Sequence, residues 1–267
     1  MRTRKRFGQH FLEPVWADKV LAAIAPSESD AFLEIGPGSG ILTLRLAPRV
    51  SSLVAVEIDR DLSVTLAAKL PPNASIVVGD ILGVDVEAVL AGAGIAGPVR
   101  IAGNLPYNIS SPILFRLLDL ASRRRVVDAA LMVQREVADR ITADCGTSEY
   151  GVLSVLVQWR ADVQRLLTIP PGAFRPPPEV RSALIRLSFR PPHVPVSDPA
   201  LFEQMIRRMF TQRRKTLTNA LAAFAADAGV DAAAIVASAG IDARRRPETL
   251  EIIEMARLAD HFAAART

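Results

Sequence analysis

The chain has 267 residues, half of them apolar, and a formal net charge of +4. This length is enough for one packed core and a smaller second domain, and no apolar run approaches the ~20 residues that cross a bilayer, which excludes a membrane-spanning protein. The single Cys145 excludes an internal disulfide, and the three scattered histidines lack metal-ligand spacing, so we expect a cytoplasmic protein that binds no metal ion.

Apolar runs of β type alternate with helical stretches through roughly the first 190 residues. Trp16, Val20 and Ile24 have i, i+4, i+8 spacing, which predicts a helix ahead of the first strand. The predicted strands are Ala31 to Ile35, Leu53 to Glu57, Ser75 to Val78, Val99 to Ala102, Ala129 to Val133, Val163 to Ile169 and Ala183 to Phe189. Helical spacing lies between them at Ser39 to Ala47, Asp61 to Leu70 and Ser110 to Leu120. The alternation predicts an α/β domain with a mainly parallel sheet and right-handed crossovers.

The pattern changes after Phe189. Prolines punctuate the next ten residues, which predicts a linker because proline blocks helix propagation. Two amphipathic helices follow, and their apolar faces contain Phe202, Met205, Ile206, Met209 and Phe210, and then Ile252, Met255, Ala259 and Phe262. We therefore expect two domains, residues 1–192 with the sheet and residues 193–267 as a small all-α domain.

A glycine-rich turn follows the first strand, in Glu34-Ile35-Gly36-Pro37-Gly38-Ser39-Gly40. Gly36 and Gly38 let the backbone turn tightly and approach a ligand closely. The third glycine falls one residue too early for the dinucleotide fingerprint, which disfavours a nicotinamide-dependent dehydrogenase.

Acidic residues end the next two strands. Glu57 stands about 20 residues after the glycines, where a carboxylate can accept both ribose hydroxyls of a nucleoside. Asp80 follows the third strand, where it can accept a hydrogen bond from an adenine amine. Because the carboxyl ends of adjacent parallel strands line one crevice, these residues predict a nucleoside-containing cofactor.

Asn104-Leu105-Pro106-Tyr107 follows the fourth strand at the same edge of the sheet. An adenine amine is a poor nucleophile because its lone pair is delocalised into the ring. The Asn104 oxygen and a backbone carbonyl can accept both of its N–H groups and direct the lone pair towards a methyl donor, while Pro106 stiffens the turn and Tyr107 offers a face for a flipped base. This tetrapeptide is therefore a candidate catalytic motif; alone, it would also be an ordinary turn.

Basic residues gather at the N-terminus, at residues 123–125, and late in the chain. Clusters of this kind indicate a polyanionic partner, although each alone would also be a solvated surface. In the late cluster, Arg213, Arg214 and Lys215 are the candidate RNA contacts.

Four motifs of the sequence resemble the adenine-N6 ribosomal RNA dimethyltransferases, in particular those that modify the small-subunit (16S) RNA. The family's Phe-Gly-Gln-x-Phe-Leu, Glu-Ile-Gly-Pro-Gly-x-Gly, Asn-Leu-Pro-Tyr-Asn-Ile and Phe-x-Pro-x-Pro-x-Val stand here at residues 7–12, 34–40, 104–109 and 174–180. The resemblance covers essentially the whole chain. It implies a Rossmann-like methyltransferase fold and S-adenosylmethionine as cofactor, and a monomer that dimethylates two adjacent adenines near the 3′ end of 16S RNA in a small-subunit precursor.

The resemblance also implies roles for individual residues. Gln9, His10 and Leu12 would close over the cofactor, which Gly36, Gly38, Glu57, Asp80 and Asn104 would bind. Phe174 would stack on the target adenine opposite Tyr107. His10 replaces an asparagine that is common at that position.

Two alternatives remain open at this point. One is the related 23S ribosomal RNA adenine methyltransferase that confers macrolide resistance, which has the same fold and type of tetrapeptide. The other is a nucleic-acid-binding assembly or transcription factor on the same scaffold, which the intact Glu57, Asp80 and Asn104 disfavour.

Overall fold

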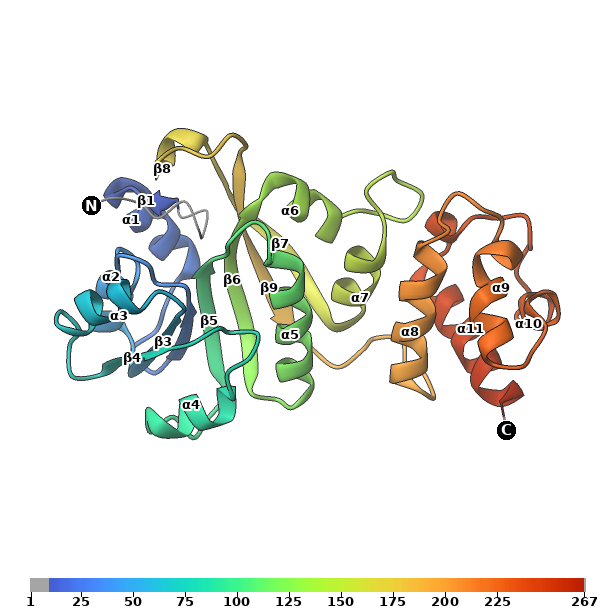
Figure 1. The fold of residues 1–267 in the computed structure, drawn as a ribbon, viewed down its shortest axis with the longest axis horizontal. Coiled ribbons are helices and arrows are strands. Elements are labelled where there is room, and N and C mark those ends of the chain that lie inside the picture. Colours follow the sequence, from blue (N-terminus) through green and yellow to red (C-terminus); the bar gives the residue numbers. More distant parts are fainter. Residues whose placement is uncertain (1–9, 267) are drawn as a thin grey trace. The chain divides into compact units, whose positions relative to one another are not determined.

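The structure, a computed structural model, describes residues 10–266 and divides into two compact units (Figure 1). The sheet unit comprises the described residues up to Ala138 together with Asp162–Phe189. The helical unit comprises Asp139–Ala161 and the chain from Arg190 onward. In this division the chain leaves the sheet unit after Ala138, returns at Asp162 and leaves it again after Phe189, close to the boundary expected at residue 192.

The sheet unit contains a seven-stranded sheet with the order β4-β3-β2-β5-β6-β9-β7. Strands β4, β3, β2, β5 and β6 are parallel, and β9 is antiparallel to β6. The strands are β2 (Ala31–Ile35), β3 (Ser52–Glu57), β4 (Ala74–Val78), β5 (Val99–Asn104), β6 (Val126–Gln134), β7 (Ala161–Ile169) and β9 (Ser182–Phe189). All seven predicted strands are confirmed, and so is the mainly parallel arrangement.

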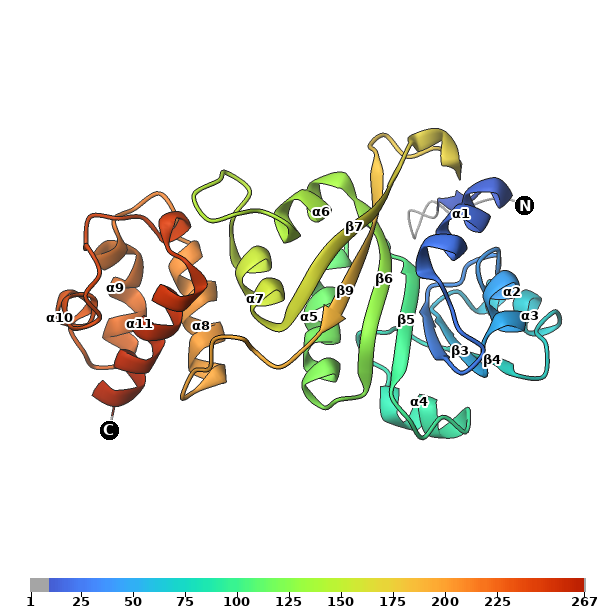
Figure 2. The same ribbon diagram turned by 180° about the vertical axis from the view of Figure 1, so that it is seen from behind.

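Helices cover both faces of this sheet (Figures 1 and 2). Helix α5 packs on β6, in front of the sheet in Figure 1 and behind it in Figure 2. The helices are α1 (Pro14–Ile24), α2 (Thr43–Leu46), α3 (Arg60–Ala67), α4 (Val86–Gly92), α5 (Ser110–Ser122) and α6 (Arg135–Ile141), which continues into the helical unit. The helix predicted from Ser39 starts only at Thr43, because a turn with glycines in the left-handed region precedes it.

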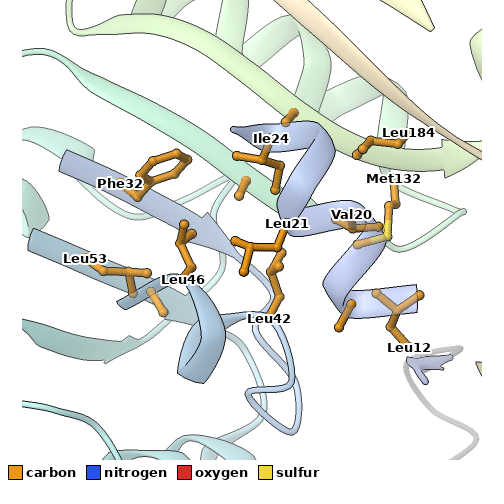
Figure 3. Close-up of a cluster of buried hydrophobic side chains, with 14 of the residues drawn as sticks. Leu12, Val20, Leu21, Ile24, Phe32, Leu42, Leu46, Leu53, Met132 and Leu184 are labelled. Carbon is orange, nitrogen blue, oxygen red and sulfur yellow. The ribbon is translucent and has the colours of Figure 1, made fainter. Parts of the chain in front are cut away.

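Helix α1 packs on one face of the sheet. Its Val20, Leu21 and Ile24 are buried against apolar side chains of the strands, among them Phe32 and Met132 (Figure 3). The predicted spacing is thus confirmed for Val20 and Ile24, while Trp16 is only partly buried. Proline suits the first position of this helix, where its missing N–H has no helical partner.

A two-stranded sheet not expected from the sequence joins β1 (Phe11–Leu12) to β8 (Phe174–Arg175). The antiparallel register pairs Phe11 with Arg175 and Leu12 with Phe174. Two motifs more than 160 residues apart in the sequence are thereby placed side by side.

The helical unit consists mainly of α7 (Val152–Arg160), α8 (Pro199–Phe210), α9 (Leu217–Asp227), α10 (Ala232–Ser238) and α11 (Ile252–Ala265). The predicted apolar face of α8 is buried, and the Phe202 ring lies 4.6 Å from the ring of Trp159 on α7. Among the described residues, no single helix is long and apolar enough to cross a membrane; α9 and α10 reach that length only as a pair, with a bend of 115° between them.

Candidate active site

A cavity of about 380 Å³ opens at the carboxyl ends of the parallel strands. Its wall includes the glycine turn, the residues that follow β3 and β4, and the Asn104–Tyr107 tetrapeptide. Gly36 and Gly38 have φ values of 64° and 57°, a region that side chains rarely adopt. A Cβ on Gly38 would come within 3.1 Å of the Phe11 ring. The turn therefore requires glycine both for its conformation and for its closeness to the β1 segment.

Glu57 connects the end of β3 to the glycine turn. Its Oε2 accepts a hydrogen bond from the Gly38 N–H at 2.9 Å, and its Oε1 accepts one from the Asp59 N–H at 3.0 Å. The carboxylate is buried, yet it lines the cavity. Each carboxylate oxygen has a further lone pair, so Glu57 can accept two ligand hydroxyls without losing these bonds.

Asp80 stands at the same edge, two residues after the end of β4. It is exposed, and its Oδ1 accepts a hydrogen bond from the Leu82 N–H at 2.9 Å. Sequence reasoning missed Ile58 and Leu82, which line the cavity beside the two acids. Ile58 is 49% exposed although it is apolar, and it offers a flat base an apolar contact. The available signal was an apolar residue close behind each strand-end acid.

Asn104 is the last residue of β5, and its side-chain orientation is fixed by a contact with the N-terminal segment. Its Nδ2 donates to the His10 carbonyl oxygen at 2.9 Å. Because a carbonyl oxygen only accepts hydrogen bonds, this contact leaves Oδ1 as the atom that can receive a donor from a ligand. Asn104 lines the cavity, as do the other three residues of the tetrapeptide.

The rest of the tetrapeptide lies in the turn that precedes α5, and hydrogen bonds hold this turn. Leu105 is buried, and its N–H donates to the Met132 carbonyl at 3.0 Å. The Pro106 carbonyl accepts the Ser110 hydroxyl at 3.0 Å and the Ile109 N–H at 3.2 Å. These bonds hold the turn in place and occupy the Pro106 carbonyl, so Leu105 is the better candidate for the carbonyl that meets an amine.

Tyr107 is half-buried and stacks on a neighbouring ring. Its hydroxyl lies 2.9 Å from the Ser182 hydroxyl, and burial raises the pKa of the phenol, partly opposed by the bond to Ser182. The His10 ring stacks on Tyr107 with centroids 5.6 Å apart, and its Nδ1 donates to the Pro176 carbonyl at 2.7 Å. His10 thus covers one face of the ring that was predicted to receive a base.

Two predicted residues of the N-terminal motif lie beside this site, and one does not fall within the described residues. His10 and Leu12 line the cavity, with Leu12 only 6% exposed. Gln9 lies outside residues 10–266.

Phe174 is placed differently from the expectation. Its side chain is fully buried in the core cluster around α1 and does not line the cavity. Leu12, its partner in the β1–β8 pair, is buried in the same cluster. In this conformation Phe174 has no exposed face for a base.

Glu34 is a cavity residue that the sequence reasoning did not single out. It is the fourth of the five β2 residues and is 2% exposed. Burial raises its pKa to about 7; the nearby Thr43 hydroxyl offsets part of this rise and the charge of Glu57 adds to it. The signal in the sequence was a carboxylate inside an otherwise apolar strand.

The cavity has an acidic lining. Glu34, Glu57 and Asp80 line it, and no lysine or arginine among the described residues does so. Such a lining fits a cationic ligand and disfavours the pyrophosphate of a dinucleotide. Together, three features fit S-adenosylmethionine. These are glycines that admit close approach, a carboxylate able to hold two hydroxyls, and an uncompensated buried carboxyl.

In the helical unit, the three predicted basic residues differ in exposure and in their contacts. Arg213 is partly buried; its Nε pairs with Glu248 at 3.0 Å, and it donates to the Ser148 carbonyl at 2.7 Å. Arg214 and Lys215 are exposed. The Leu217 N–H donates to the Arg245 carbonyl at 2.7 Å, which brings a second loop, with the exposed Arg246, beside them. Sequence reasoning missed Arg246, although the run of three arginines at 244–246 was visible.

Comparison with known proteins identifies the family. Residues 1–263 match the family described as "Ribosomal RNA adenine dimethylase". A protein of Xanthomonas euvesicatoria pv. vesicatoria named "Ribosomal RNA small subunit methyltransferase A" is 43% identical over 261 residues, which are 96% of this chain and 95% of the relative. The Bordetella avium protein of the same name is 42% identical and covers 99% of this chain and 97% of its own.

Two solved structures share the fold. A dimethyladenosine transferase from Plasmodium falciparum superposes with a TM-score of 0.77 at 22% identity, covering 96% of this chain and 98% of that one. The 23S rRNA methyltransferase ErmE superposes with a TM-score of 0.69 at 24% identity, covering 95% and 99%. The fold is therefore that of Rossmann-like methyltransferases, and the chain belongs to the ribosomal RNA adenine dimethylase family.

Proposed function

We propose that this chain transfers methyl groups from S-adenosylmethionine to the N6 amines of two adjacent adenines near the 3′ end of 16S ribosomal RNA. The substrate would be a small-subunit precursor in the cytoplasm, and the enzyme would act as a monomer. The observation that carries the proposal is the Asn104 side chain, oriented by the His10 carbonyl at the edge of an acidic cavity. Full-length relatives named for the small subunit support this choice of RNA.

The residues at the strand ends would hold the cofactor. Glu57 would accept the ribose hydroxyls and Asp80 the adenine amine, while Gly36 and Gly38 would let the backbone approach the methionine portion. Gln9, His10, Leu12 and Asn104 would complete the site. When bound, S-adenosylmethionine supplies a methyl group on a positively charged sulfur.

The tetrapeptide would hold the target amine. Asn104 Oδ1 and the Leu105 carbonyl accept its two N–H groups and favour a pyramidal nitrogen, whose lone pair is then available for attack. Pro106 has no backbone N–H and keeps the turn rigid. No strong base is needed, because the nitrogen becomes acidic as it is methylated, and the proton passes to solvent. Catalysis here is mainly positioning and electrostatic stabilisation.

Stacking would hold the base after the first methylation, which removes one N–H donor. Tyr107 would provide one ring for this purpose when the His10 ring moves off it. Phe174 would provide the other only if the β8 segment moves, because its ring is buried in the core.

The helical unit would bind RNA phosphates. Arg214 and Lys215 are exposed, and Arg246 lies on the adjoining loop. Arg213 would act indirectly, since its pair with Glu248 holds the loop that carries the other two. Backbone contacts of this type position an RNA without reading its sequence.

Primer extension on ribosomal RNA from a strain that lacks this protein tests the proposal, because dimethylated adenine blocks base pairing. We expect two adjacent stops near the 3′ end of 16S RNA to disappear and to return when the gene is restored. A lost stop in 23S RNA would indicate the macrolide-resistance type of enzyme. Unchanged stops in both RNAs would indicate that the protein is a non-catalytic assembly factor.

A further inference from the structure

Glu34 presents an unpaired buried oxygen at the wall of the cofactor cavity. Among the described residues its Oε2 has no hydrogen-bond partner, and the side chain is 2% exposed. Strand β2 lies between β3 and β5, and register contacts with Ala55 and Ala102 fix the backbone at Glu34. A charged carboxylate buried in this way is costly unless a proton or a positive charge compensates it.

Among the described residues that line the cavity beside Glu34, none is a lysine or an arginine. The other titratable residues that line the cavity are His10, Glu57, Asp80 and Tyr107, and Thr43 lies nearby from α2. Burial and the neighbouring Glu57 raise the pKa of Glu34 to about 7, with Thr43 acting in the opposite direction. With these neighbours, the carboxyl binds a proton at and below neutral pH.

The cofactor and its product differ in the charge that could replace this proton. S-adenosylmethionine has a positively charged sulfur and an α-ammonium group. S-adenosylhomocysteine, formed when the methyl group leaves, keeps the ammonium but has a neutral thioether. A carboxyl that responds to the extra charge can distinguish the two molecules.

We propose that Glu34 senses the charge of the cofactor, giving up its proton to solvent when S-adenosylmethionine binds and taking one back when the neutral thioether is left. The inference rests on the proposed function, because that function defines the cofactor. A product-bound site would then hold its ligand more weakly than the cofactor-bound site. This difference favours exchange of product for fresh cofactor, which dimethylation of two bases requires repeatedly.

Calorimetry of the intact protein in two buffers of different ionisation enthalpy measures the protons released on binding. At pH 7 we expect roughly half a proton per S-adenosylmethionine, since a carboxyl with a pKa of about 7 is then half protonated. S-adenosylhomocysteine should release clearly fewer. The α-ammonium of each ligand can titrate as well, and the same ligand measured with Glu34→Gln subtracts that contribution.

The pH dependence gives a second readout. Affinity for S-adenosylmethionine should rise as the pH increases through 7, by about tenfold for each unit by which the bound cation lowers the pKa of Glu34. Glu34→Gln keeps the size of the side chain but cannot ionise. It should release no extra proton, flatten the pH dependence and reduce the preference for cofactor over product. The exposed Glu28→Gln is the matched control and should behave as wild type.

Equal proton release with the two ligands in the wild-type protein would overturn the proposal, as would unchanged release in a folded Glu34→Gln protein. If that variant does not fold, the wild-type comparison alone decides. A wild-type protein that binds neither ligand would overturn the proposed cofactor as well.

Discussion

The acidic cavity of the sheet unit and the basic loops of the helical unit, residues 213–215 and 244–246, differ in charge and in construction. The cavity is lined by Glu34, Glu57 and Asp80, which lie at or near the ends of strands, and Glu57 also accepts a hydrogen bond from the glycine turn. In the basic loops Arg214 and Lys215 are exposed, whereas Arg213 forms an ion pair with Glu248 of the same unit. A small cationic ligand needs a fixed set of acceptors, whereas an RNA backbone needs only positive charge within reach. Substitutions should therefore have large, specific effects at the cavity and small, salt-dependent effects on the loops.

Phe174→Ala should have the largest effect on stability. Removing a fully buried ring from the core leaves a cavity, and the expected loss is about 3–5 kcal/mol. Denaturant unfolding measures it. Phe174→Leu should fold better, and it tests base stacking through the ratio of mono- to dimethyladenine in the product. An unchanged ratio in Phe174→Leu would argue against stacking, and a small loss of stability in Phe174→Ala would contradict the buried position.

Asn104→Ala should reduce methyl transfer by on the order of 100-fold or more, because it removes an acceptor that acts in the transition state. Binding of RNA should change little. Rates of methyl incorporation and RNA affinity, measured on the same preparation, separate the two effects. Near-normal turnover would contradict the assigned role of Asn104.

Glu34→Gln should change how stability depends on pH. The pKa of Glu34 is raised by burial from 4.5 to about 7, so the folded state binds more protons than the unfolded state between these values. The wild-type protein therefore loses roughly 3 kcal/mol of stability from this group as the pH rises through that window. Unfolding free energies at pH 5 and pH 8 should show a smaller decrease in the variant. Unfolding free energies that depend on pH in the same way in both proteins would contradict the raised pKa of Glu34.

Glu57→Ala should weaken cofactor binding by roughly 1–3 kcal/mol, because two ligand hydroxyls lose their acceptor. The variant also loses the bonds to the Gly38 and Asp59 N–H groups, so the turn should loosen. Calorimetry with S-adenosylmethionine measures the loss, with Glu28→Ala as the exposed control. An unaltered affinity would remove Glu57 from the site.

Replacing Arg214 and Lys215 with alanine should have the smallest effect at low salt. Each lost phosphate contact reduces the slope of log affinity against log salt by about 0.7–0.9. Cofactor binding should stay unchanged. Lys69→Ala, an exposed change in the sheet unit, is the control. Arg213→Ala should instead lower the stability of the helical unit. An identical salt slope in the double variant would mean that Arg214 and Lys215 do not contact RNA phosphates.

The sequence predicted most strands well because they are mainly apolar runs between clear turns. The discrepancies have physical causes. Strand β6 begins at Val126, whereas the predicted strand began at Ala129. The prediction started late because Asp128 interrupts the apolar run. That carboxylate is tolerated in the sheet because Arg100 Nε contacts it at 2.8 Å, a partner from the neighbouring strand that spacing does not indicate.

Part of the cavity lining was also predictable from the sequence. Glu57, Asp80 and Asn104 converge because the ends of parallel strands meet at one edge, a rule that needs no coordinates. The burial of Phe174, the stacking of His10 on Tyr107 and the pairing of Arg213 with Glu248 depend on contacts between distant segments. Only the folded chain shows which side chains these contacts occupy.

Incubating the purified protein with labelled S-adenosylmethionine and small-subunit precursors, followed by mass spectrometry of the digested RNA, tests most directly that the acidic cavity and Asn104 serve adenine dimethylation. The expected product is N6,N6-dimethyladenosine at two adjacent positions near the 3′ end of 16S RNA, nearly absent with Asn104→Ala. Label confined to 23S RNA, or to a position other than the adenine amine, would contradict it.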